Sequence, residues 1–292
     1  MPVEPHPIFK TPPADGPLWR YTNFAKFVSL ITTKSLWFSN MYHLSREDPF
    51  EGALPVGNFA HRTWSLDTIP ASVRDRLERG RFSSNPNDTL EEKLRLYIEH
   101  EEDMVRHVLR TTKEYFINCW HSSNHESVAM WKMYAEDSFG IAIVSDVDRI
   151  TRALAGSPLS IQCGMVDYID YDTETLDLGN AFTPTITKRL SFSHEREVRL
   201  LYWDHTLGEE QVAMLWGGEP RVMWMPKSHD DHAKIDPPAG KTFQCDLDIL
   251  IKEVRIAPTA EPWFEAAVRA FCKAAQFDKP IIKSDMTRSP MR

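Results

Sequence analysis

The stretch that decides the fold is residues 191–203, which read Ser191-Phe192-Ser193-His194-Glu195-Arg196-Glu197-Val198-Arg199-Leu200-Leu201-Tyr202-Trp203. Its aromatic and aliphatic end favours a β-strand over a helix. Because side chains alternate along a strand, one face carries Glu195, Glu197 and Arg199, and the other carries Val198 and Leu200. Charged side chains rarely enter a protein core unless they are paired. The stretch is therefore either a structural ladder of ion pairs or a functional site.

The composition is that of a globular protein with a sizeable core. Of the 292 residues, 42% are hydrophobic and 26% are charged. The net charge of −8 argues against a broad nucleic-acid-binding surface. Four scattered cysteines without a CxxC pair indicate free thiols in a reducing compartment. No apolar run approaches the ~20 residues of a membrane span. We therefore expect a cytoplasmic protein without a membrane partner.

The order of local patterns predicts one α+β domain over residues 18–290. Six prolines in residues 1–17 indicate an extended arm before it. Short apolar runs then alternate with helical patterns, which predicts a mixed or antiparallel central sheet with flanking helices. Residues 60–113 are rich in charge at helical spacing and predict an inserted helical segment. The glycine- and proline-containing stretch of residues 216–240 reads as a loop.

Seven short motifs follow one another along the chain: Leu18-Trp19-Arg20-Tyr21-Thr22, Leu36-Trp37-Phe38-Ser39, Asp48-Pro49-Phe50-Glu51-Gly52, Cys119-Trp120-His121-Ser122, Met130-Trp131-Lys132-Met133-Tyr134, Gly140-Ile141-Ala142-Ile143 and Glu195-x-Glu197-x-Arg199. In this order they resemble a bacterial family known as domain-of-unknown-function family 2971. The family usually has Asn before its Asp-Pro-Phe motif, where this chain has Glu47.

A second resemblance is to ADP-ribosyltransferases, in which an Arg or His, a Ser or Thr, and a Glu lie on successive strands. Arg20, Ser39 and Glu197 match that order. The resemblance implies an enzyme of the toxin or phage-defence type that uses NAD to modify a protein or a nucleic acid. Glu197 would hold the ribose 2′-hydroxyl and Glu195 would orient the acceptor. The NAD-binding residues implied are Arg20 on the pyrophosphate, Tyr21, Trp37 or Phe38 on the nicotinamide, and Ser39 and Arg199.

Other functional classes stay open at this point. A non-catalytic binding or sensor module of a defence system would use the charged strand to meet a partner. A metal-dependent nuclease would use Asp48, Glu51, Glu195 and Glu197. The motif His229-Asp230-Asp231-His232 lacks a third ligand at useful spacing, so it predicts no metal site.

Two spatial expectations follow for the transferase. Arg20 should line one pocket with Glu195 and Glu197, and the Asp48–Gly52 loop should lie beside that pocket. The sequence sets neither the acceptor nor the oligomeric state.

Overall fold

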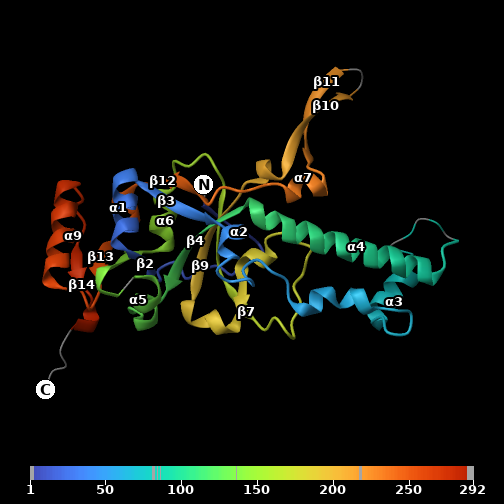
Figure 1. Cartoon of the computed structure of the whole chain (residues 1–292), viewed down its shortest axis with the longest axis horizontal. Helices are drawn as coiled ribbons and strands as arrows, with labels where there is room; N and C mark the ends of the chain where they lie inside the picture. Colours follow the sequence, from blue (N-terminus) through green and yellow to red (C-terminus); the bar gives the residue numbers. More distant parts are fainter. Residues whose placement is uncertain are drawn as a thin grey trace.

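A ten-stranded sheet forms the centre of the computed structural model, which describes residues 3–80, 83, 85, 87–135, 137–216 and 219–287. Eight strands follow in the order β1-β6-β9-β4-β2-β5-β13-β14, while β3 pairs with β4 and β12 pairs with β3 (Figure 1). The strands are β1 (Val3–Pro5), β2 (Leu18–Asn23), β3 (Ser35–Asn40), β4 (Tyr115–Ser122), β5 (Gly140–Ser145), β6 (Ile161–Met165), β9 (Glu197–Trp203), β12 (Gly240–Gln244), β13 (Glu253–Ile256) and β14 (Ile281–Lys283).

The sheet is mixed. Two described pairs, β1–β6 and β13–β14, are parallel, whereas pairs such as β4–β9 and β2–β5 are antiparallel. The predicted α+β class with a mixed central sheet is therefore confirmed. Part of the proline-rich arm joins the sheet, since β1 adds an edge strand beside β6.

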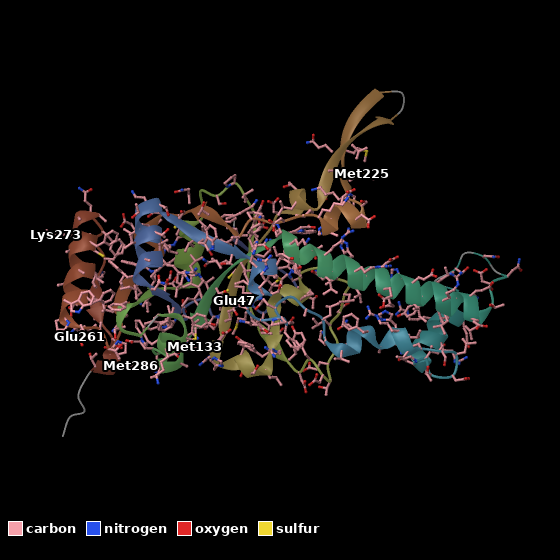
Figure 2. The ribbon with its side chains drawn as sticks, viewed as in Figure 1. Glu47, Met133, Met225, Glu261, Lys273 and Met286 are labelled. Atoms are coloured by element: carbon pink, nitrogen blue, oxygen red, sulfur yellow. The ribbon has the colours of Figure 1, made fainter. Side chains whose placement is uncertain are left out.

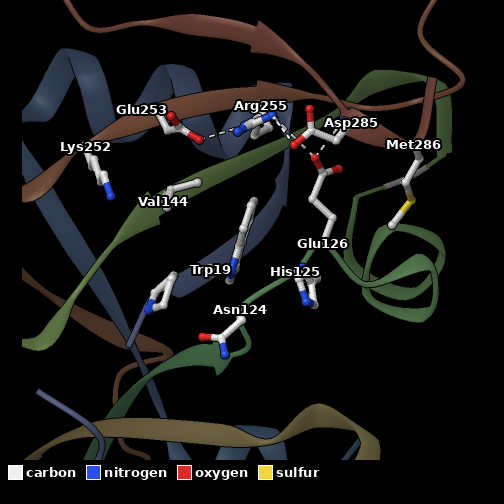
Figure 3. Close-up of a pocket in the computed structure, with 11 residues that line it drawn as sticks. Trp19, Asn124, His125, Glu126, Val144, Lys252, Glu253, Arg255, Asp285 and Met286 are labelled. Atoms are coloured by element: carbon white, nitrogen blue, oxygen red, sulfur yellow. Dashed lines mark hydrogen bonds and ion pairs between the residues drawn. The ribbon is translucent and has the colours of Figure 1, made fainter. Parts of the chain in front are cut away.

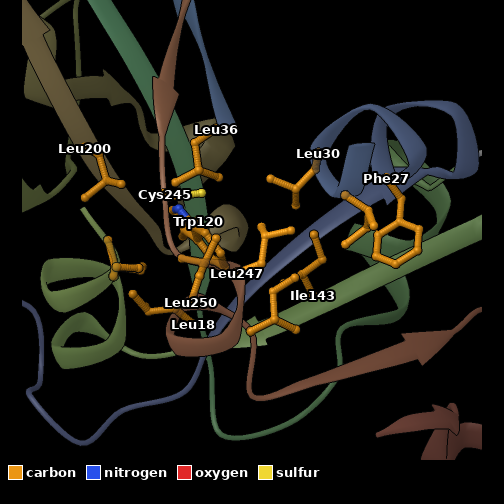
Figure 4. Packing of buried hydrophobic residues seen from close by; sticks show 14 of the residues in the cluster. Leu18, Phe27, Leu30, Leu36, Trp120, Ile143, Leu200, Cys245, Leu247 and Leu250 are labelled. Carbon is orange, nitrogen blue, oxygen red and sulfur yellow. The ribbon is translucent and has the colours of Figure 1, made fainter. Parts of the chain in front are cut away.

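One face of the sheet carries the main hydrophobic core, and we call it the core face. Val198 and Leu200 of β9 have no exposed surface, and Trp120 of β4 is 1% exposed. Burying an aliphatic side chain of this size contributes about 1.5–3 kcal/mol. The helices that contribute side chains to this core are α1 (Phe24–Thr33), α6 (Val147–Ala153), α8 (Leu247–Leu250) and α9 (Pro262–Ala274). Figure 4 shows Phe27 and Leu30 of α1 and Leu247 and Leu250 of α8 among them.

Shorter elements cover the opposite face, which we call the site face. Helix α5 (Val128–Tyr134) packs Met130 and Trp131 against Trp19 and Tyr21 of β2. The end of the face at β9 is covered by a small parallel sheet of β7 (Asp167–Ile169) and β8 (Thr187–Arg189), and by the 3-10 helix η5 (Leu190–Glu195). The site face is thus the one on which the charged residues of β9 lie.

A helical segment extends away from the sheet (Figure 1). It contains the 3-10 helix η1 (Val56–Thr63), α3 (Ala71–Glu78) and α4 (Leu90–Thr111). Thr89 and Glu92 form a capping box that satisfies free backbone N–H groups at the start of α4. The helices bury their own apolar cluster, which includes Leu77 and Leu94. Within the described ranges, no helix combines the length and apolar character needed to cross a bilayer.

The predicted loop over residues 216–240 is wrong in large part. Strands β10 (Glu209–Trp216) and β11 (Glu219–Pro226) form an antiparallel hairpin that projects from the body, with Met225 on its second strand (Figure 2). Pairing with a neighbouring strand overrides the weak local pattern. The other short helical elements described are α2 (Met41–Leu44), η2 (Thr112–Glu114), η3 (Asp137–Phe139), η4 (Thr183–Ile186), η6 (His205–Leu207), α7 (His229–Ala233) and η7 (Asp285–Thr287).

Candidate functional site: a buried cluster of carboxylates and cations

Strand β9 orients the two charged residues at its start. Glu197 and Arg199 point to the site face because Val198 between them is buried in the core face. In the pairing with β4, Glu197 lies opposite His121 and Arg199 lies opposite Cys119. The alternation predicted from the sequence therefore holds from residue 197 onward.

Glu195 reaches the same place by a turn rather than by strand alternation. Strand β9 begins at Glu197, and Glu195 is the last residue of η5. Arg196 between them has φ 42° and ψ 51°, in the left-handed region, which costs a non-glycine residue about 1–2 kcal/mol. Across this turn, Nζ of Lys188 lies 2.6 Å from Oε2 of Glu195 and 3.2 Å from Oε2 of Glu197.

Arg199 completes a group of five ionisable side chains that we call the carboxylate cluster: Glu51, Lys188, Glu195, Glu197 and Arg199. Arg199 donates from Nε to Oε1 of Glu197 at 2.7 Å and from Nη1 to the carbonyl oxygen of Thr185 at 2.5 Å. Its Nη1 also lies 2.6 Å from Oε1 of Glu51, an ion pair outside hydrogen-bond geometry. The Arg199 side chain is 1% exposed.

Glu51 brings the Asp48–Gly52 loop to the cluster. Its Oε2 lies 3.6 Å from Nζ of Lys188, in addition to the contact with Arg199. Asp48 in the same loop pairs with Arg189, which follows Lys188 in β8, at 2.8 Å. The loop therefore lies near Glu197, as expected, while a pocket lined by Arg20, Glu195 and Glu197 stays a prediction.

The cluster holds Glu197 in its ionised form. Burial by itself would raise the pKa of Glu197, but Arg199 and Lys188 outweigh burial and lower the pKa to about 2. Burial also works against the charge of Lys188, whereas the three carboxylates favour it and raise its pKa above the ordinary value. Three carboxylates face two cations, so the cluster carries one net negative charge.

Two tyrosines contact the two glutamates, one at the carboxylate and one at the backbone. The Tyr134 hydroxyl at the end of α5 donates to Oε1 of Glu195, and Tyr134 is 44% exposed. Burial and this hydrogen bond raise the pKa of Tyr134. The hydroxyl of Tyr168 in β7 accepts from the backbone N–H of Glu197 at 2.8 Å. Glu195 itself is 3% exposed, so the cluster lies directly beneath the surface at Tyr134.

A row of side chains leads along the site face away from Glu197. The register places Trp19 of β2 opposite His121 of β4, and His121 opposite Glu197. Neighbouring strands lie ~4.8 Å apart, so the row spans roughly 10 Å. His121 Nδ1 lies 2.5 Å from the carbonyl oxygen of Glu195, and burial lowers the pKa of this imidazole. Beside the row, burial raises the pKa of the Cys119 thiol, which suits an inert thiol rather than a nucleophile.

Arg20 is not brought to the carboxylate cluster by any contact of the described residues. Because side chains alternate along β2, the side chain of Arg20 leaves the strand on the same face as the buried Leu18 and on the opposite face from Trp19. Its guanidinium donates from Nη1 to the carbonyl oxygen of Cys119 at 3.0 Å, and burial lowers its pKa. A role for Arg20 on a pyrophosphate stays a prediction.

Of the other predicted NAD-binding residues, Arg199 belongs to the carboxylate cluster and Trp37 is 46% exposed, whereas Tyr21, Ser39 and Phe38 lie in three different places. Tyr21 is on the site face, where its ring packs edge-on against Trp131 with 5.0 Å between the ring centroids. Ser39 pairs with Ile117, four residues before His121 in β4, hence roughly 13 Å along the strand from the row. Phe38 has no exposed surface and packs on Phe243 in the core face, 4.3 Å between ring centroids.

Three residues that contact the cluster had no predicted role: Lys188, Tyr168 and Tyr134. Lys188 stands in a short strand without periodic pattern, and Tyr168 in another. Tyr134 does belong to the Met130–Tyr134 motif, so the family resemblance contained a signal for it. Helical spacing alone does not show which side chain of a short helix faces a charged partner.

The carboxylates are arranged around a cation that the protein supplies itself. Nζ of Lys188 lies within 3.6 Å of Glu51, Glu195 and Glu197. A divalent ion bound there would have to displace this ammonium group. No set of three or more His, Cys, Asp or Glu side chains in the described part of the chain is arranged to hold a metal. His232 of the sequence motif instead faces Glu114, at 2.9 Å.

Comparisons with known proteins give little beyond this geometry. No family model matches the chain, so the resemblance to family 2971 gains no support from such models, and no curated protein matches either. The solved structure of Thermus sp. 2.9 DarT in complex with ADP-ribosylated ssDNA is similar over 95% of this chain and 97% of that chain. The identity is 11% and the TM-score is 0.33, which is too low to assign a fold or a function to this chain.

Proposed function

We propose that this protein is an NAD-dependent ADP-ribosyltransferase that modifies a macromolecule, with Glu197 and Glu195 as its catalytic carboxylates. The observation that carries the proposal is the environment of Glu197. It is a buried carboxylate at the entry of a strand, two residues after a second carboxylate, with Nε of Arg199 at 2.7 Å and Nζ of Lys188 at 3.2 Å, two cations that lower its pKa and keep it ionised. A fixed negative charge is what a developing positive charge on a sugar requires.

The chemistry assigns different tasks to the two carboxylates. The bond between nicotinamide N1 and ribose C1′ breaks, and nicotinamide leaves with the bonding electron pair. The sugar passes through an oxocarbenium-like state, as in glycoside hydrolysis, which the charge of Glu197 stabilises. An oxygen or nitrogen atom of the acceptor then bonds to C1′, and Glu195 accepts the proton that the acceptor loses.

Access to the carboxylates would come at Tyr134. Its hydroxyl donates to Glu195 while the residue is 44% exposed, so rotation of this one side chain would uncover Glu195. Among the predicted NAD-binding residues, Arg199 and Tyr21 have the best support, because Arg199 contacts Glu197 and the ring of Tyr21 shares the site face with it. Arg20 and Phe38 have less support, since Arg20 bonds a backbone carbonyl and Phe38 is fully buried.

A non-catalytic binding module is the second candidate, and a specific observation favours it. Every carboxylate of the cluster has a cation within 3.6 Å, and Glu197 is only 5% exposed. A network of this kind also occurs as a purely structural device that fixes a loop against a sheet. In that case the cluster would have no substrate.

One set of assays separates the candidates. The full chain is incubated with NAD carrying a label on its adenylate phosphate, with single-stranded DNA or with a cell protein extract as acceptor. Nicotinamide release and label transfer that persist with EDTA support the transferase. Cleavage of the DNA that EDTA abolishes would support the nuclease instead. If neither activity is detected with either class of acceptor, the binding module remains as the candidate and the transferase proposal is overturned.

A further inference from the structure

A cavity of about 370 Å³ beside β13 contains charged groups that are already bound to one another (Figure 3). Arg255 donates from Nε to Oε1 of Glu253 at 2.7 Å, and its Nη1 lies 3.1 Å from Oδ2 of Asp285. Trp19 at the floor is only 6% exposed. These side chains therefore face one another rather than a ligand. The hairpin of β10 and β11, by contrast, presents backbone groups that no other part of the described chain pairs with.

The β10–β11 hairpin forms a two-stranded sheet of its own, which projects from the body (Figure 1). A two-stranded sheet is at best marginally stable in water, and a third strand or a packed helix is what normally stabilises it. Met223 and Met225 of β11 are each 38% exposed. Within the described residues, the hairpin therefore lacks the third strand that a stable sheet requires.

The register of the hairpin shows which backbone groups point away from it. At its base, the N–H group of Lys227 donates to the carbonyl oxygen of Gly208 at 2.9 Å. In an antiparallel ladder, such hydrogen-bonded pairs alternate with pairs whose N–H and C=O groups point outward. Counted from that base, the outward residues are Glu209, Gln211, Ala213 and Leu215 in β10, and Pro220, Val222, Trp224 and Pro226 in β11.

The two outer edges differ in their ability to accept another strand. The edge of β11 has Pro220 and Pro226 at outward positions, and proline has no N–H group to donate. Proline in an edge strand is one way in which proteins prevent further pairing. The sequence of β10 contains no proline, so each of its four outward residues offers both an N–H and a C=O group. Strand addition is therefore expected at β10.

The charges of β10 select the added strand and its direction. Glu209 and Glu210 are adjacent at the start of the strand, and its sequence contains no cation. A second copy of β10 in parallel would place these carboxylates beside each other, which is destabilising. An antiparallel second copy places them beside its uncharged end instead. Because both copies have the same unpaired edge, a two-fold contact satisfies the N–H and C=O groups of both.

We propose that two copies of this chain join by antiparallel pairing of their β10 strands, which gives a four-stranded sheet in the order β11-β10-β10-β11. The register that uses all four outward residues of each copy places the two-fold axis at Val212. Glu209 then lies opposite Leu215 of the second copy. Val212 lies opposite its own counterpart, in a pair without hydrogen bonds. The proposal does not depend on the cluster at Glu197 being catalytic.

The first test is a disulfide across the two-fold axis of the full chain. The Cα atoms of a pair without hydrogen bonds lie about 4.5 Å apart, within the range of about 4.4–6.8 Å that a disulfide spans. With oxidised glutathione, Val212→Cys should form a covalent dimer at least about tenfold faster than Met225→Cys, whose strand lies on the outside of the proposed sheet. The parent, with its four free cysteines, gives the background rate. Equal rates in the two variants would overturn the proposal.

The second test is sedimentation equilibrium, in which the parent should show twice the chain mass of 33.7 kDa. Gln211→Pro removes one outward N–H group and no hydrogen bond of the hairpin, so it should raise the Kd of the dimer at least about tenfold. Gln211→Ala keeps the N–H group and is the matched control, which should sediment as the parent does.

Three results would contradict pairing with a second copy. The first is a parent that sediments as a monomer, and the second is a dimer of Gln211→Pro as tight as that of the parent. The third is cross-linking of Val212→Cys only to another protein of a cell extract, which would assign the edge of β10 to a different partner.

Discussion

Glu51 and Arg199 form a buried ion pair between a loop and the central sheet: Oε1 of Glu51 lies 2.6 Å from Nη1 of Arg199, and the side chains are 5% and 1% exposed. The pair fixes the Asp48–Gly52 loop against β9. Through Arg199 it also connects Glu51 to Glu197. The loop and the strand are thus held together by charges that have little contact with water.

The first prediction concerns the cation at the centre of that arrangement. Arg199→Met leaves three carboxylates facing Lys188 alone, and breaking a buried pair in this way costs about 3–5 kcal/mol. Urea unfolding of the variant should show a loss of that size. Arg269→Met, which removes a half-exposed partner of Glu265, is the control and should lose no more than about 1 kcal/mol. If the two variants lose the same free energy of unfolding, the claim that the cluster stabilises the fold is contradicted.

The second prediction follows from the lowered pKa of Glu197. The group has a pKa of about 2 in the folded protein against 4.5 as its ordinary value. A lowered pKa gives stability that is present above pH 4.5 and is lost as the pH falls toward 2. The contribution is on the order of 3 kcal/mol. Urea unfolding at a series of acidic pH values should show that the free energy of unfolding falls less steeply with pH in Glu197→Gln than in the parent. Parallel pH profiles of the two proteins would refute this prediction.

The third prediction tests the turn that brings Glu195 and Glu197 together. Arg196 has a φ of 42°, which glycine adopts readily and a β-branched residue does not. Arg196→Gly should change stability by less than about 1 kcal/mol in either direction. Arg196→Val should lower the melting temperature clearly, because strain at such a position costs about 1–3 kcal/mol. If valine is tolerated as well as glycine, the left-handed turn is not what sets the geometry.

The sequence contained the pattern of β9 but not the surroundings of its charges. Val198 and Leu200 alternate with Glu197 and Arg199, and that local pattern is sufficient to assign their two faces. Lys188 reaches Glu197 because β8 pairs in parallel with the distant β7, a relationship without a local signal. The sequence also does not show that Glu195 lies before the strand, because nothing in the residue type of Arg196 indicates a left-handed turn.

Arg20 shows why the faces of β2 could not be assigned. Leu18, Trp19 and Tyr21 are all large and all buried, so hydrophobic alternation does not separate one face from the other. Only the register with β4 shows that Trp19, not Arg20, continues the row that leads to Glu197. The core residue Phe38 was ambiguous for the same reason, since exposed Trp37 precedes it and is equally aromatic.

The most direct test of the central claim is the rate of nicotinamide release from NAD by Glu197→Gln, measured beside Glu114→Gln. Both carboxylates are buried and hydrogen-bonded, Glu114 to His232 and Trp203, so both variants should lose stability. Each rate is taken at a temperature at which the variant is folded. Loss of the charge that faces the oxocarbenium should lower the rate of Glu197→Gln at least about a hundredfold, or ~2.7 kcal/mol of barrier, while Glu114→Gln keeps the parent rate. Equal rates in the two variants, or no release by the parent with any acceptor, would contradict a catalytic role for Glu197.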